Sequence, residues 1–214
     1  TLLIDDAITK VNGEAEMVNN QLLISTLYAR AFHPGANFPK PKSSNVKISG
    51  LIDFSQFFSP DYDLKIKARN VSFETLPLDL TAIANIDAII SGMDTVKIDG
   101  NIEILDATLF YEFATADIGE SITDESGPVI MYDLTIPIRN QALFQNSQVD
   151  AKVSGELSIK HDGNHDMNFD GQIIVEDGNV FSYKDSFEEL KGYITFDNKG
   201  FNPYMDLVAF TDID

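Results

Sequence analysis

The sequence predicts an all-β protein built around one extended sheet with a single apolar face. Apolar residues recur at a spacing of two in short segments over most of the chain, which places each set on one side of a strand. The positions between them are mostly Lys, Asp, Ser and Thr, so the other side of the sheet is expected to face water. Turn-rich stretches such as 34–41 and 59–61 separate the segments.

The alternating segments follow one another along the chain. They are Leu22/Ile24, Val46/Ile48, Ile52/Phe54, Leu64/Ile66/Ala68, Val96/Ile98, Ile102/Ile104, Leu134/Ile136/Ile138 and Val149/Ala151/Val153. Residues 78–90 are the only helical candidate, but their apolar spacing fits a helix poorly and reads as well as two strands. Residues 116–128 are rich in Asp, Glu, Gly and Ser. This composition predicts an acidic mobile loop inserted in one continuous sheet.

An internal repeat supports the extended sheet. Residues 99–111 align without a gap onto residues 170–182, and both copies begin with Asp-Gly and continue as an apolar strand. A weaker copy begins at Gly50. Repetition suggests stacked units with a continuous core, although Gly-initiated strands also recur by chance in a β-sandwich.

The last third of the chain contains an ordered series of glycine-bounded strands. They are Gly155–Ile159, Gly171–Gly178, Val180–Tyr183, Gly192–Phe196 and Pro203–Ala209, with Phe187 between the third and fourth. This order resembles the C-terminal domain of the TamB (translocation and assembly module) family, which belongs to the AsmA-like group of proteins that bridge two membranes. One departure is the loop 160–166, which differs from the short connection typical of the family.

The resemblance implies a fold, a location and partners. The fold is an elongated curled sheet, the β-taco or half-pipe, with an apolar concave interior. The location is the periplasm, in a parent protein anchored in the inner membrane, of which residues 1–214 are one continuous β domain and a fragment. Residues 1–115 correspond to preceding AsmA-like repeats, and residues 129–214 to the TamB-like segment. The implied partners are phospholipid and an outer-membrane β-barrel of the assembly-machinery type.

Composition narrows the function. With 34 acidic and 15 basic residues among 214, the formal charge of −19 argues against nucleic-acid binding and against lying directly on an anionic membrane. The absence of Cys rules out disulfides and thiolate metal sites. No apolar run approaches the roughly 20 residues of a membrane helix.

A one-sided sheet must hide its apolar face, and the sequence offers no amphipathic helix to cover it. Curling into a trough, as in the AsmA-like half-pipe, leaves an apolar groove suited to acyl chains. We expect Val175 and Phe196 near the mouth of this groove. The residues predicted to line it are Ile98, Ile102, Ile104, Leu134, Ile136, Leu157, Ile159, Ile173, Val175, Ile194, Phe196, Met205 and Leu207.

No catalytic motif is found, and no cofactor is implied. His161 and His165 flank a predicted solvated turn rather than a metal site. Residues 166–177 satisfy most of the EF-hand calcium formula through Asp166, Asn168, Asp170 and Asp177, but their flanks look like strand, and a polar strand edge is the favoured interpretation. Two alternatives to a lipid conduit remain: a structural or adhesive β protein with a closed core, and a carbohydrate-active β enzyme.

Overall fold

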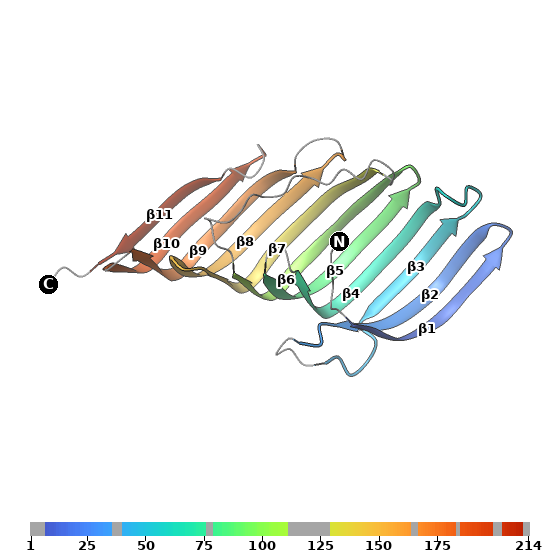
Figure 1. The fold of residues 1–214 in the computed structure, drawn as a ribbon, viewed down its shortest axis with the longest axis horizontal. Helices are drawn as coiled ribbons and strands as arrows, with labels where there is room; N and C mark the ends of the chain where they lie inside the picture. Colours follow the sequence, from blue (N-terminus) through green and yellow to red (C-terminus); the bar gives the residue numbers. More distant parts are fainter. Residues whose placement is uncertain are drawn as a thin grey trace.

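The computed structural model describes residues 7–35, 40–75, 79–110, 129–163, 167–182, 185–198 and 203–211. These residues form a single sheet of eleven strands whose spatial order is the order of the sequence (Figure 1). The strands are β1 (Ala7–Val18), β2 (Gln21–Phe32), β3 (Val46–Asp53), β4 (Asp61–Thr75), β5 (Leu80–Gly92), β6 (Thr95–Phe110), β7 (Val129–Gln145), β8 (Val149–His161), β9 (Asn168–Ser182), β10 (Asp185–Asp197) and β11 (Tyr204–Phe210). The predicted all-β class is therefore confirmed.

Neighbouring strands are antiparallel except for β6 and β7, which run parallel. Within the segment 78–90, which fitted a helix poorly, residues 80–90 belong to one strand, β5, rather than to two. The acidic loop predicted at 116–128 lies outside the described residues.

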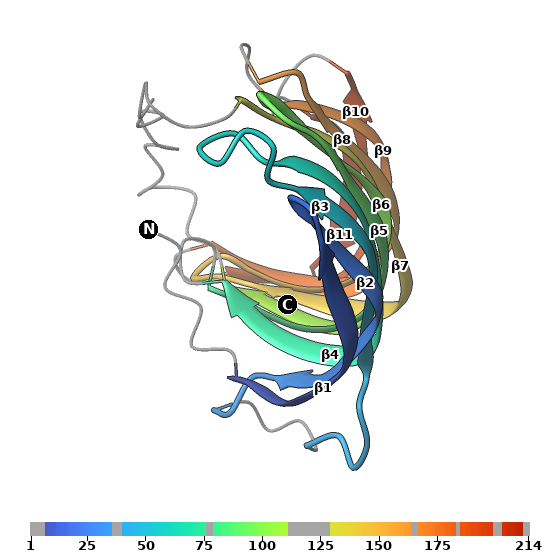
Figure 2. The same ribbon diagram turned by 90° about the vertical axis from the view of Figure 1, so that its right-hand side faces the viewer.

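The strands bend strongly, so that the sheet curls into an open C when viewed along its length (Figure 2). Register shifts mark the bend in most strands. They fall at Thr9/Asn12 in β1, Ile24/Leu27 in β2, Ala68/Val71 in β4, Ile104/Asp106 in β6, Ile138/Ala142 in β7, Val175/Asp177 in β9 and Glu188/Lys191 in β10. Because a β-bulge bends its strand and increases the local twist, a line of bulges across the sheet curls it.

The internal repeat has a structural counterpart. Leu105 of β6 is the extra residue between Ile104 and Asp106, and Glu176 of β9 is the extra residue between Val175 and Asp177. Leu105 and Glu176 occupy the same position in the two repeat copies. The repeat thus encodes a bulge as well as an alternating strand.

Mid-strand glycines are a second source of curvature. Gly155 and Gly192 have φ of 134° and 146°, which L side chains rarely adopt. A Cβ atom at these positions would lie 2.2 Å from the carbonyl oxygen of Gln172 and 2.0 Å from that of Asp206. At both points the strand approaches its neighbour too closely for any side chain.

Asn45 completes the sheet where β3 is shorter than its neighbours. Its side-chain amide donates to the carbonyl oxygen of Ala31, and its side-chain oxygen accepts from the Ala31 amide, both at 2.9 Å. Beyond it, the His33 amide donates to the Ser72 hydroxyl of β4 at 3.0 Å. The end of β2 is thereby tied to β4 directly.

The floor of the curled sheet is made of small residues. Seven alanines with little or no exposure lie there: Ala29, Ala68, Ala82, Ala84, Ala107, Ala142 and Ala151. Five of them belong to two buried clusters: Ala82, Ala84, Ala107 and Ala142 pack with Ile104, and Ala151 packs with Val175 and Leu190. Curvature crowds the concave side, so the positions nearest the bend accept little more than a methyl group.

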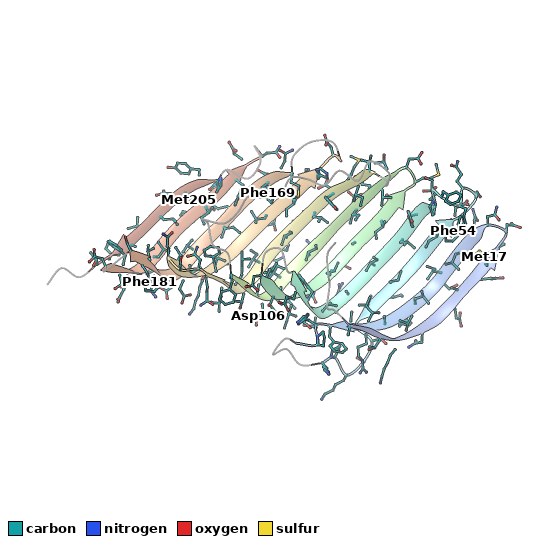
Figure 3. The ribbon with its side chains drawn as sticks, viewed as in Figure 1. Met17, Phe54, Asp106, Phe169, Phe181 and Met205 are labelled. Carbon is teal, nitrogen blue, oxygen red and sulfur yellow. The ribbon has the colours of Figure 1, made fainter. Side chains whose placement is uncertain are left out.

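Larger apolar residues of the same face are only partly covered. Leu64, Ile66 and Ile136 are half-buried, and no large side chain among the described residues is fully buried. Figure 3, which looks onto this face, places Phe169 and Met205 toward one rim and Phe181 toward the other. The described chain therefore presents a concave apolar face without a second layer over it.

We expect Gly155→Ala and Gly192→Ala to destabilise the protein by about 2 kcal/mol or more, because the added Cβ meets backbone atoms in a conformation disfavoured for Ala. Urea unfolding midpoints measure the effect. Glu156→Ala, at the adjacent exposed position of β8, is the matched control and should change stability little. Equal effects of Gly155→Ala and Glu156→Ala would contradict the proposed close approach.

Truncation of the half-buried residues distinguishes an uncovered face from a closed core. Ile66→Ala and Ile136→Ala should each cost less than about 2 kcal/mol, whereas Leu190→Ala, at a position only 4% exposed, should cost about 2–5 kcal/mol. The same unfolding measurements test this. A cost above about 3 kcal/mol at both isoleucines would indicate a closed core.

Candidate functional site

The register brings the predicted lining residues onto one face. Residues paired across neighbouring strands project to the same side of a sheet. One such row crosses five strands, from Ile138 through Gly155, Ile173 and Ile194 to Met205. A second row runs through Val153, Val175, Gly192 and Leu207. By strand alternation from these rows and their neighbours, all thirteen residues lie on the apolar concave face. Figure 3 looks onto this face and labels one of them, Met205.

The thirteen residues differ in how far they are covered. Ile104, Ile173, Val175 and Phe196 are buried; seven are half-buried, and Met205 and Leu207 of the edge strand are exposed. Side-chain exposure therefore increases along the rows, from the buried floor to the exposed edge strand β11.

One expectation needs correction. Val175 and Phe196 were expected near the mouth, but they are only 4% and 8% exposed. Val175 packs in the cluster of Ala151 and Leu190, and the ring of Phe196 lies 6.0 Å from that of Phe169. Both belong to the floor, because the bulge of β9 and the bend of β10 bring neighbouring side chains over them.

The apolar face also extends over strands that the lining prediction left out. Ile48 of β3 pairs with Ile66 of β4, Leu64 of β4 pairs with Ile90 of β5, and Ile86 of β5 pairs with Ile102 of β6. The alternation in β3 and β4 was visible in the sequence. In β5 it was obscured, because Ile83 and Ile89 occupy the opposite face.

A polar pair interrupts the apolar face near one rim. His161 was expected in a solvated turn, but it ends strand β8 and pairs with Tyr132 of β7. Their rings stack with centroids 5.7 Å apart, and the Nδ1 atom of His161 is buried without a hydrogen-bond partner. His165 lies outside the described residues.

Charged side chains gather on the convex face. Arg69 contacts Asp87 at 2.8 Å, Arg139 contacts Glu103 at 3.3 Å, and Lys160 contacts Asp133 at 3.7 Å. On the same face, a hydrogen bond from Lys97 to Asp99 raises the pKa of Lys97. These exposed pairs add little stability, but they keep one side of the sheet wet and the other apolar.

The calcium formula falls on a strand. Asn168, Asp170 and Asp177 all lie in the extended strand β9, so the polar-strand interpretation is confirmed for them. Among the described residues, no three His, Cys, Asp or Glu side chains are grouped so as to hold a metal ion. Nor does that part of the chain contain a helix long and apolar enough to cross a membrane.

The two edge strands differ in character. β11 reads Tyr-Met-Asp-Leu-Val-Ala-Phe, with Asp206 as its sole charge, and nearly all of it is exposed. β1 carries Lys10, Glu14 and Glu16 and is bulged. Charges and bulges normally protect an edge from pairing with another chain. β11 lacks most of that protection.

Comparison with known proteins identifies the family to which the chain belongs. The family model described as the TamB C-terminal domain matches residues 38–214, which is longer than the segment 155–209 that carried the resemblance in sequence. No curated protein matches the chain significantly. Because the match includes every strand from β3 to β11, the chain belongs to the TamB C-terminal domain family, part of the TamB/AsmA-like machinery of the cell envelope.

Proposed function

We propose that the concave apolar face holds the acyl chains of phospholipids and carries them along the curled sheet between two membranes. One observation carries this proposal: the apolar face runs through consecutive strands on the inner side of the curl and remains half-exposed over most of its length. An uncovered apolar face of this extent is typical of a binding surface.

The energetics suit acyl chains. Each methylene transferred from water to this face contributes roughly 0.8 kcal/mol. Isoleucine, leucine and valine side chains offer no directional contacts, so a chain can shift along the face without breaking hydrogen bonds. Head groups would stay in water at the open side of the C, and lipids with different head groups could therefore share one path. Such a carrier needs no catalytic residue, and we propose no enzymatic activity.

The sheet can be extended by further strands at its edges. Eleven strands spaced about 4.8 Å apart extend for about 50 Å. Among the described residues, the outer sides of β1 and β11 are not paired with a further strand, so further strands of the parent protein can extend the same trough. Together with membership in the TamB C-terminal domain family, this is the basis on which we propose a periplasmic location, a parent anchored in the inner membrane, and a role in supplying lipid to the outer membrane.

The poorly protected edge β11 suits a second partner. An extended strand of an outer-membrane β-barrel can add to such an edge through main-chain hydrogen bonds. This contact would join the trough to the outer membrane and link lipid supply to outer-membrane protein assembly.

A structural or adhesive protein with a closed core is the competing function. A closed core buries large side chains completely, whereas in the described chain the residues with no exposure at all are Ala82 and Ala84. The open face therefore favours the conduit.

Site-specific photocrosslinkers test whether lipid occupies the concave face. In cells, crosslinkers at Ile102 and Ile194, which are half-buried on that face, should capture phospholipid. Those at Val175 and Phe196 should capture less, because the floor is closed. Crosslinkers at Glu103 and Thr195, which project from the convex face, are the controls. Equal capture of phospholipid from both faces would contradict the proposal.

A charge placed on the path tests whether lipid must travel along it. Met205 and Leu207 are concave and 52% and 36% exposed, so Met205→Glu and Leu207→Glu leave the new carboxylate hydrated and the fold intact. The charge adds a barrier of roughly several kcal/mol to a passing acyl chain. In the parent protein we expect increased outer-membrane permeability at normal protein abundance.

Val208→Glu supplies the matched control, because Val208 lies on the convex side of the same strand and is 54% exposed. It should leave permeability unchanged. If the concave and convex variants are equally active, lipid does not pass over this part of the face; if both fail equally, the defect lies in the edge strand itself.

A further inference from the structure

One rim of the sheet carries two exposed phenylalanines near its N-terminal end. Phe57 and Phe58, in the connection between β3 and β4, are 74% and 98% exposed. Figure 3 labels Phe54, the residue that begins this connection, at the same rim. We call Phe57 and Phe58 the apolar tip.

The connection that bears the two phenylalanines is held in place. The Phe54 amide donates to the Asn20 carbonyl oxygen at 2.8 Å, which ties it to the β1–β2 turn. The Ser59 hydroxyl donates to Asp94, which ties it to the β5–β6 turn. The Ser59 amide also donates to the Gln56 carbonyl oxygen at 3.0 Å. Three successive turns are thereby joined along the rim.

The entry to the connection is fixed as well. The Ser55 amide donates to Asp53 at 2.7 Å, and Gln21 donates to the same carboxylate at 2.8 Å. These hydrogen bonds lower the pKa of Asp53, that from Gln21 having the largest effect. The rings of Phe57 and Phe58 pack edge to face, 5.4 Å apart. The protein therefore presents two phenyl rings to water on an ordered support.

Such an arrangement is unfavourable in water alone. Residues 54–60 contain no charged side chain, unlike the usual polar turn between strands. Several polar groups of the connection are already hydrogen-bonded within the protein, which suits an apolar phase, where unpaired groups are costly. An interface with another protein typically contains about one hydrogen bond per 100–200 Å². Polar groups that are already hydrogen-bonded within the connection are less suited to such an interface.

We infer that the apolar tip inserts into the interfacial layer of a lipid bilayer. Aromatic side chains favour that layer, where the apolar ring reaches the acyl boundary. Asp53 and Asp61 flank the connection and no Lys or Arg lies within it, so the tip favours neutral over anionic lipid. This contact is separate from the concave face and goes beyond the proposed conduit.

Tryptophan fluorescence tests the inference directly, because the chain contains no Trp. In Phe58→Trp, neutral phosphatidylcholine vesicles should shift the emission to the blue, and brominated acyl chains should quench it. Flotation with the same vesicles should show roughly tenfold weaker binding of a Phe57→Ser/Phe58→Ser variant. Phe181→Ser/Phe210→Ser removes two other exposed phenyl rings and should bind as the unchanged chain does. Adding anionic lipid should weaken binding.

The controls separate this contact from the conduit. Phe196→Trp reports on the concave floor and should stay unquenched by intact vesicles. Unchanged emission of Phe58→Trp overturns the bilayer contact. Quenching of both tryptophans by lipid that remains with the protein after the vesicles are removed also overturns it, while supporting the conduit. A dimer that dissociates in Phe57→Ser/Phe58→Ser, with no vesicle binding, assigns the tip to a second copy instead.

Discussion

The structure depends on one constraint: in the described part of the chain no second layer covers the apolar face of the sheet, so the sheet must reduce the contact of this face with water by curling. Bulges, mid-strand glycines and the alanine floor all serve this requirement. The bulge at Glu176 bends β9, Gly155 allows β8 to approach it, and Ala151 leaves room where the two strands turn. None of the three is needed in a flat sheet packed on a partner layer.

Stability in such a molecule is unevenly distributed. Buried apolar contacts concentrate in the middle of the sheet, around Ala84 and Ile104, and in the cluster of β8, β9 and β10. β1 is exposed along almost its whole length, and β11 is little better covered. Elements with few buried contacts open at low cost, so both ends of the sheet are the places where neighbouring segments contribute most to order.

The faces of this sheet could be predicted from sequence, but its curvature could not. Alternation of period two places Ile173 and Val175, or Ile102 and Ile104, on one side whatever the register. The bulges at Leu105 and Glu176 could not be found from the sequence of one strand. A bulge is an extra residue relative to the partner strand, so it can be identified only when the pairing of both strands is known. For the same reason Val175 was expected at the mouth and lies on the floor. The apolar tip was missed because turns have no periodicity against which two adjacent phenylalanines stand out.

The uncovered face links binding to folding. A ligand that binds the folded chain and not the unfolded one stabilises it by RT ln(1 + [L]/Kd), about 2.7 kcal/mol at a hundredfold excess over Kd. Acyl chains lying against Leu64, Ile66 and Ile136 would cover the atoms that a second protein layer covers in a sandwich. In the proposed conduit, lipid would then act as a transient part of the core. A permanent layer would add more stability, but it would occupy the surface that the proposed passage of lipid needs. The half-exposed side chains of the concave face fit such a passage better than they fit maximal burial.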